Sequence, residues 1–125
     1  MENSSGATIL IVDDFEDTRL MMKLWLEKKG YRVVTAADGM EALMLAERES
    51  PDLIIMDLEM PKLNGLAATR RIREQEKMKN VPIIAVSAYG AEQFREAALE
   101  AGCNEYISTP FVPDELAEVL NRFLA

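Results

Sequence analysis

Apolar runs alternate with amphipathic segments five times along this chain. Strand-like runs are predicted at about 7–13, 31–36, 52–57, 81–87 and 104–108, and helical patterns at about 15–29, 39–49, 65–78, 91–101 and 113–124. Continuous apolar runs are typical of parallel strands buried on both faces, and their alternation with helices predicts right-handed βαβ crossovers. We therefore expect an α/β fold, namely a flavodoxin-like, doubly wound sheet of five parallel strands in the order 2-1-3-4-5.

The ends of two helical patterns carry an ordinary stop signal. Gly30 follows the first pattern and Gly102 follows the fourth, and glycine commonly ends a helix in the left-handed conformation. A chain of 125 residues suits one domain. We expect that domain to cover residues 7–125, behind a flexible polar leader at residues 1–6.

The composition excludes several classes of function. A net charge of −8 argues against direct binding of nucleic acid, whose phosphates are bound by Lys and Arg, and we expect the basic trio Arg70, Arg71 and Arg73 to be a solvated face. The chain has no histidine, which removes most catalytic triads and zinc hydrolase sites, and its one cysteine, Cys103, excludes an internal disulfide. Without a signal peptide or an apolar run near the roughly 20 residues that span a bilayer, the expected location is cytoplasmic, away from the membrane.

Acidic residues end two of the predicted strands. Asp13 and Asp14 follow the first strand and Asp57 ends the third, and these strands flank the switch point where ligands bind in such sheets. Three carboxylates at one place must be protonated, bind a cation or reduce stability, so a divalent metal site beside a reactive aspartate is the simplest interpretation. Alternatively, Asp13 or Asp14 could cap the following helix, and Asp57 could be a solvated acid at a strand end.

These residues resemble the receiver domain of two-component response regulators, over essentially the whole chain. The matching pieces are Ile11-Val12-Asp13-Asp14, Asp57-Leu58-Glu59-Met60-Pro61 with Asn64-Gly65, Val86-Ser87-Ala88, Tyr106 and Thr109-Pro110. The resemblance implies that a histidine kinase or a histidine phosphotransfer protein phosphorylates Asp57. It also implies that Asp13, Asp14, Asp57 and the backbone carbonyl of Glu59 hold Mg²⁺, a hard cation that prefers oxygen ligands. Such a protein is a signalling switch and not a conventional enzyme.

The resemblance assigns two further residues. Ser87 would donate its hydroxyl to the phosphoryl group, and Tyr106 would be the aromatic switch that turns inward when that hydroxyl moves. Ser87 could instead belong to an ordinary turn at the end of a strand. Tyrosine on a strand is equally often an edge or a core residue.

Thr109 departs from the family pattern, because receiver domains carry lysine at this position. Threonine offers a hydroxyl but no charge, and a charge-assisted hydrogen bond is roughly twice as strong as a neutral one. Phosphorylation could therefore be slower, or its coupling to the output surface weaker. A third reading is a pseudo-receiver, an interaction module that signals without phosphate. We favour retained phosphorylation. Lys62, in the loop after Asp57, could supply a substitute cation, but we favour its reading as an ordinary solvated loop lysine.

The first helical pattern has more apolar residues than one buried face requires: Leu20, Met21, Met22, Leu24, Trp25 and Leu26. Some of them could dock the phosphodonor, or all could belong to a Met-rich core helix. The resemblance places a downstream protein target on the face formed by residues 91–101, 104–108 and 113–124. The sequence ends there, so we expect a stand-alone receiver or a fragment of a larger regulator.

Two alternatives come from other classes. A flavin-binding flavodoxin would share the architecture, but the acidic loop Asp13-Asp14-Phe15-Glu16-Asp17 would repel its phosphate. A metal-dependent phosphohydrolase would also use aspartates at strand ends, but a separate acid/base group and a substrate pocket are not evident.

Overall fold

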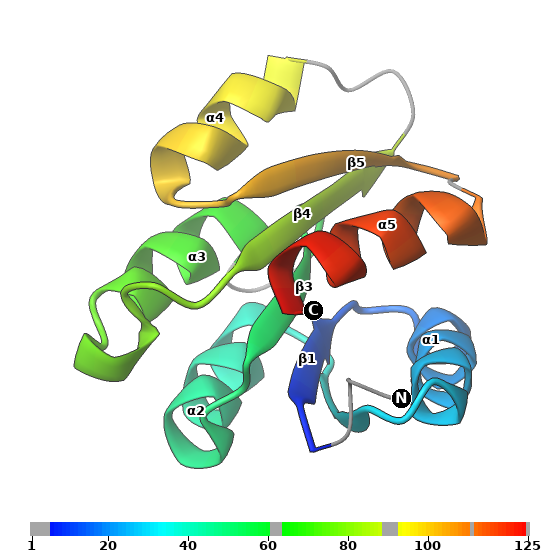
Figure 1. Cartoon of the computed structure of the whole chain (residues 1–125). Coiled ribbons are helices and arrows are strands. Elements are labelled where there is room, and N and C mark those ends of the chain that lie inside the picture. The colour runs from blue at the N-terminus through cyan, green and yellow to red at the C-terminus, as the bar shows by residue number, and fades with distance from the viewer. Residues whose placement is uncertain (1–5, 61–63, 89–92, 111, 125) are drawn as a thin grey trace.

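Five parallel strands form one sheet in the order β2-β1-β3-β4-β5, as predicted. The computed structural model describes residues 6–60, 64–88, 93–110 and 112–124 (Figure 1). The strands are β1 (Thr8–Val12), β2 (Arg32–Ala36), β3 (Leu53–Asp57), β4 (Ile83–Ala88) and β5 (Glu105–Thr109). The helices are α1 (Glu16–Lys28), α2 (Gly39–Glu49), α3 (Gly65–Arg73), the short 3₁₀ helix η1 (Glu76–Met78), α4 (Gln93–Ala101) and α5 (Pro113–Leu124). The predicted leader lies mostly outside the described residues.

Helices cover both faces of the sheet (Figure 1). Helices α1 and α5 pack on one face, over a core that includes Ile9, Ile11, Ile55, Leu116 and Leu120. Helices α2, α3 and α4 cover the other face, over a second core that includes Leu10, Ile54, Met56, Ile72 and Ala98. Because neighbouring residues of a strand point to opposite faces, the uninterrupted apolar runs supply both cores.

The third helix ends earlier than predicted. The pattern at 65–78 predicted one helix, whereas α3 stops at Arg73 and η1 follows from Glu76. Arg73 is partly buried, so the expectation of a solvated basic face is wrong for this residue, while Arg70 and Arg71 are exposed. Its guanidinium donates hydrogen bonds to the carbonyl oxygens of Met78 (2.7 Å), Val81 (2.6 Å) and Gly102 (2.7 Å). These bonds satisfy backbone carbonyls at the end of η1, before β4 and just after α4.

Both predicted glycine stops are confirmed. Gly30 follows α1 with φ 102°, and Gly102 follows α4 with φ 119°. Both values lie in the left-handed region, where a side chain is strained. The two helices therefore end where the sequence predicted.

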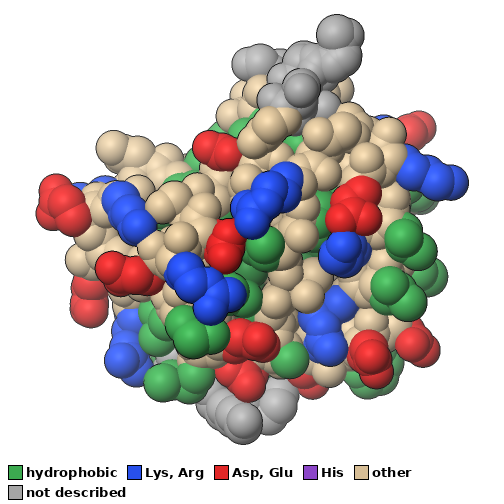
Figure 2. Space-filling model, turned by 90° about the horizontal axis from the view of Figure 1, so that it is seen from below, with side chains coloured by type: hydrophobic (Ala, Val, Ile, Leu, Met, Phe, Trp, Pro, Cys, Tyr) green, Lys and Arg blue, Asp and Glu red, His purple; other side chains and the backbone are tan. Residues whose placement is uncertain are grey.

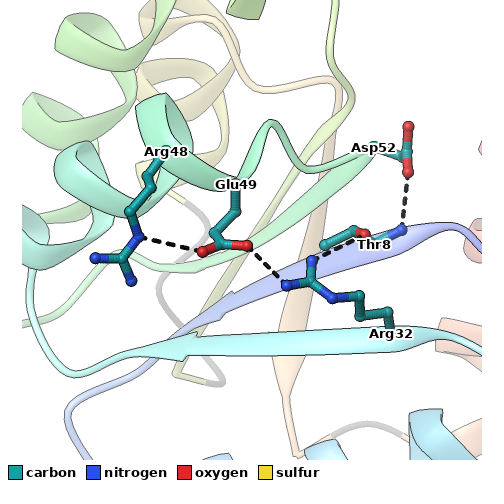
Figure 3. Close-up of polar contacts among 5 residues, drawn as sticks. All are labelled: Thr8, Arg32, Arg48, Glu49 and Asp52. Atoms are coloured by element: carbon teal, nitrogen blue, oxygen red, sulfur yellow. Dashed lines mark hydrogen bonds and ion pairs between the residues drawn. The ribbon is translucent and has the colours of Figure 1, made fainter.

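A polar cluster joins the amino ends of β1, β2 and β3 (Figure 3). Arg32 donates to Glu49 Oε1 (2.8 Å) and to Thr8 Oγ1 (3.4 Å), and Arg48 donates to Glu49 Oε2 (3.2 Å). The Thr8 amide donates to Asp52 Oδ2 (2.8 Å). These contacts link the starts of β1, β2 and β3, and the backbone pairing of the sheet sets which residues meet at the carboxyl ends of these strands.

Charges of both signs are mixed on the lower side of the molecule as drawn in Figure 1. Figure 2 shows Lys and Arg side chains interspersed with Asp and Glu on this face, with hydrophobic side chains between them. Among the described residues, every helix is too short or too polar to cross a membrane.

Candidate functional site

The carboxyl ends of β1 and β3 bring three acids together. These strands pair in register, with Val12 beside Met56, so the residues that follow lie next to each other. One carboxylate oxygen from each of Asp13, Asp14 and Asp57 lies within 4.8 Å of the other two. The structure thus gathers the three acids that the sequence placed at one switch point.

Burial and mutual repulsion perturb this cluster. The pKa of Asp57 is raised to about 7, mainly because burial disfavours its charged form, and further because Asp13, Asp14 and Glu59 repel it. The backbone N–H of Glu59, which donates to Asp57 Oδ1 (3.0 Å), acts in the opposite direction. Burial also raises the pKa of Asp13, against the hydrogen bond from the Phe15 N–H (2.8 Å). The cluster is therefore a place where a cation would relieve a real electrostatic cost.

The chemistry of these donors fits a hard divalent cation. Asp13 and Asp57 each use Oδ1 to accept a backbone N–H, which leaves the second oxygen of each carboxylate for a ligand. The N-cap residue of α1 is Phe15, which makes no side-chain cap, so the capping alternative for Asp13 and Asp14 is not what the structure shows. Oxygen-only ligand sets with carboxylates are typical of Mg²⁺ sites.

The loop after Asp57 is held against the end of β3 by a close backbone approach. The Gly65 N–H donates to the Leu58 carbonyl (3.3 Å), and the Leu58 N–H donates to the Val86 carbonyl (3.0 Å). A Cβ atom on Gly65 would overlap the backbone oxygen of Asp57 and lie 2.6 Å from Leu58 Cα. Glycine is required here by space. Pro61 and Lys62, which the sequence analysis also considered, lie outside the described residues.

Ser87 is held on two sides at the end of β4. Its side chain is 2% exposed, and its hydroxyl donates to Glu59 Oε2 at 2.7 Å. Its backbone carbonyl accepts a hydrogen bond from Thr109 Oγ1 (3.0 Å), across the β4–β5 pair. The Thr109 hydroxyl is thus bonded to the backbone of the neighbouring strand.

These groups line an open cavity of about 340 Å³. Its lining includes Asp13, Asp14, Asp57, Glu59, Ser87 and Thr109. The sequence predicted a role only for the backbone carbonyl of Glu59 and not for its side chain. An acid two residues after a strand-end aspartate was the available signal, but its direction depends on the loop and is not encoded by spacing.

Tyr106 is a core residue of β5. It is 6% exposed and belongs to the core beneath α2, α3 and α4. Although β5 is an edge strand of the sheet, the Tyr106 side chain points into the core.

Helix α1 exposes several apolar side chains, and one of them, Met21, lines a hollow that begins at Asp13. Leu26 is buried, whereas Leu20 (54%), Met21 (71%) and Leu24 (54%) are exposed, so the core reading is wrong for these three. Met22 and Trp25 are partly buried. A hollow of about 560 Å³ runs from Asp13 between α1 and the start of α5, lined among others by Met21, Trp25, Pro110 and Leu116.

Comparison with known proteins places these features in one family. Residues 9–121 match the response regulator receiver domain. The chain is 32% identical over 117 residues to the polar-differentiation response regulator DivK of Brucella ovis, covering 94% of this chain and 95% of that protein.

Solved structures agree with that match. The chemotaxis protein CheY4 of Vibrio cholerae aligns with a TM-score of 0.90 at 33% identity, covering 96% of this chain and all of that one. The receiver domain of the sensor histidine kinase PA1611 of Pseudomonas aeruginosa, described with a magnesium ion coordinated in its active site cleft, aligns with a TM-score of 0.88 at 42% identity, covering 96% and 98%. These similarities favour a receiver over the flavodoxin and phosphohydrolase alternatives.

Proposed function

The chain belongs to the response regulator receiver domain family, and from this premise we propose that it accepts a phosphoryl group on Asp57. In that step the P–N bond of a phosphohistidine breaks, its electron pair returns to the imidazole nitrogen, and a carboxylate oxygen of Asp57 forms the new P–O bond. The observation that carries the proposal is the convergence of Asp13, Asp14 and Asp57 within 4.8 Å at the carboxyl end of the sheet.

Asp13, Asp14, Asp57 and the backbone carbonyl of Glu59 are the groups that would hold Mg²⁺. When bound, the ion would offset the negative charge shared by the carboxylates and the incoming phosphoryl oxygens. Asp13 is kept in place by the Phe15 N–H, and Arg19 donates to the backbone oxygen of Asp13 (2.7 Å). The loop that carries Asp13 and Asp14 is therefore held by hydrogen bonds that do not depend on a metal.

Three other residues would read out the modification. Ser87, which is buried at the end of β4, would donate its hydroxyl to a phosphoryl oxygen. Tyr106 would be the aromatic switch, but its side chain is already buried in the unmodified protein, so its response could not be the inward turn that the sequence predicted. Thr109 contributes a neutral hydroxyl bonded to Ser87, in place of a cation, so the phosphoryl group gains no charge-assisted bond from this position. The alternative is a pseudo-receiver whose acidic site is idle.

A mass measurement decides between these two functions. We expect the protein to gain 80 Da, one phosphoryl group, when it is incubated with Mg²⁺ and acetyl phosphate or phosphoramidate. The gain should disappear in Asp57→Asn and when Mg²⁺ is removed with a chelator. An unmodified wild-type protein, or an increment that survives Asp57→Asn, would contradict phosphorylation on Asp57; the first result would favour the pseudo-receiver.

The exposed apolar side of α1 is the proposed docking surface for the phosphodonor, a histidine kinase or histidine phosphotransfer protein in the cytoplasm. Its hollow begins at Asp13 and is lined by Met21 and Trp25, so a helical partner seated there would reach Asp57. A downstream protein would bind the surface formed by α4, β5 and α5, where Leu99 and Val112 are exposed. Neither role involves nucleic acid or membrane.

Met21→Glu is expected to slow phosphotransfer from a phosphohistidine protein about tenfold, because it places a charge in an apolar contact. Phosphorylation by acetyl phosphate should stay at the wild-type rate, since Met21 is 71% exposed and does not line the acidic cavity. Met44→Glu on α2, also exposed (52%), is the matched control. Equal losses with both donors would indicate damage to the fold and would argue against docking on α1.

A further inference from the structure

The Ser87 hydroxyl already has an anionic partner in the unmodified protein. It donates to Glu59 Oε2 at 2.7 Å, although Glu59 is otherwise an exposed residue on the loop after β3. A serine hydroxyl carries one hydrogen and can donate one full hydrogen bond at a time. Ser87 therefore cannot serve Glu59 and a phosphoryl oxygen together.

The surroundings of Ser87 reinforce this contact. The Thr109 hydroxyl donates to the Ser87 carbonyl (3.0 Å), which fixes the backbone of the residue whose side chain Glu59 holds. The described residues that line the cavity include four acids, Asp13, Asp14, Asp57 and Glu59, and neither lysine nor arginine. An incoming phosphoryl group would thus find the Ser87 hydroxyl already hydrogen-bonded to the Glu59 carboxylate.

We infer that Glu59 is a positioning residue that competes with the phosphoryl group for the Ser87 hydroxyl. The inference rests on the proposed function, since it concerns the same phosphorylation. When Asp57 is modified, the hydrogen bond from Ser87 Oγ passes from Glu59 Oε2 to a phosphoryl oxygen, and the proton stays on Ser87. Glu59 must then leave the cavity. The Glu59 side chain thereby slows phosphorylation of Asp57 and favours the position that Ser87 has in the unmodified protein.

Three variants separate this competition from a general charge effect. Glu59→Ala should be phosphorylated by acetyl phosphate and Mg²⁺ about tenfold faster than wild type, the rate equivalent of removing one hydrogen bond to a charged acceptor. Glu59→Gln should gain less, because its amide oxygen can still accept from Ser87 without the charge. Glu76→Gln removes the same charge from a side chain that is 91% exposed on η1, and its rate should equal that of wild type.

The role of Ser87 is tested in a Ser87→Ala background. Glu59→Ala should accelerate phosphorylation less there than in the wild type, because only the charge repulsion remains to be relieved. An equal acceleration in both backgrounds would show that Glu59 acts without Ser87 and would overturn the inference. So would a Glu59→Ala rate equal to that of wild type.

A second measurement uses the unmodified protein. In ¹H–¹⁵N NMR spectra, Glu59→Ala should move the Ser87 amide signal toward its position in the phosphorylated wild type, and Glu76→Gln should leave it in place. An unmoved Ser87 signal would overturn the inference even if phosphorylation occurs. If neither the wild type nor any variant gains 80 Da, the proposed function is wrong and the inferred competition is wrong with it. If the wild type is phosphorylated but the Glu59 variants behave like it, only the inferred competition is wrong.

Discussion

Replacing Gly65 by alanine is expected to destabilise the protein by about 2–3 kcal/mol, the cost of forcing an extra carbon into a packed site. The added Cβ would overlap the backbone oxygen of Asp57, so either α3 or the end of β3 must move. We also expect slower phosphorylation, because the displaced segment carries the phosphoacceptor. Denaturant unfolding measures the first effect and the 80 Da mass gain follows the second.

Gly6→Ala serves as the comparison for this substitution. Gly6 has φ 88° with open space around it, so alanine there should cost about 1 kcal/mol of backbone strain and leave phosphorylation unchanged. Equal losses of stability at the two positions would show that the backbone around Gly65 can shift to make room for a Cβ atom without a measurable loss of stability.

Removing the Asp57 charge is expected to stabilise the metal-free protein at pH 8. Its folded pKa, about 7, is raised above the ordinary value of 3.8, so the folded state binds this proton more tightly than the unfolded state. The resulting stability is fully present below pH 3.8 and is lost as the pH rises through about 7. A shift of about three units is worth roughly 4 kcal/mol, which partial solvent access and screening reduce to about 1–2 kcal/mol.

Unfolding of wild type and Asp57→Asn at several pH values tests this expectation. The advantage of the variant should be about 1–2 kcal/mol at pH 8 and should vanish near pH 4. Mg²⁺ should stabilise wild type more at pH 8 than at pH 5, since ligand carboxylates bind a metal only when deprotonated. Glu76→Gln removes an exposed charge and should show neither dependence. A stability difference between wild type and Asp57→Asn that ignores pH would contradict the burial of the Asp57 charge.

The sequence predicted the sheet because its information is local and repeated. The apolar runs of β1 and β3 predict strands buried on both faces, and the strand order places the ends of these two strands side by side. Asp13, Asp14 and Asp57 therefore meet as a direct consequence of topology. The end of α3 was mistaken because Arg73 binds carbonyls of residues 78, 81 and 102, and such distant partners leave no periodic signal.

The sequence pattern likewise could not predict which way the side chains around the site point. Glu59 turns toward Ser87, and Thr109 gives its hydrogen bond to the backbone of the adjacent strand. Both contacts depend on loop geometry and on which strand is the neighbour. The sequence could show that Thr109 is an unusual residue type at its position. It could not show which groups Thr109 and Glu59 would contact.

The contacts of Arg73 also hold the chain just after α4 in place. Besides the Gly102 carbonyl, the guanidinium donates to Asn104 Oδ1 (2.8 Å), and Asn104 in turn accepts the Ile83 N–H (2.9 Å). The trailing end of α4 is thereby anchored to α3 and to the first residue of β4. A displacement of β4 that starts at Ser87 is therefore expected to move the Ala101 end of α4 least, because these hydrogen bonds tie the residues just after α4 to α3 and to Ile83.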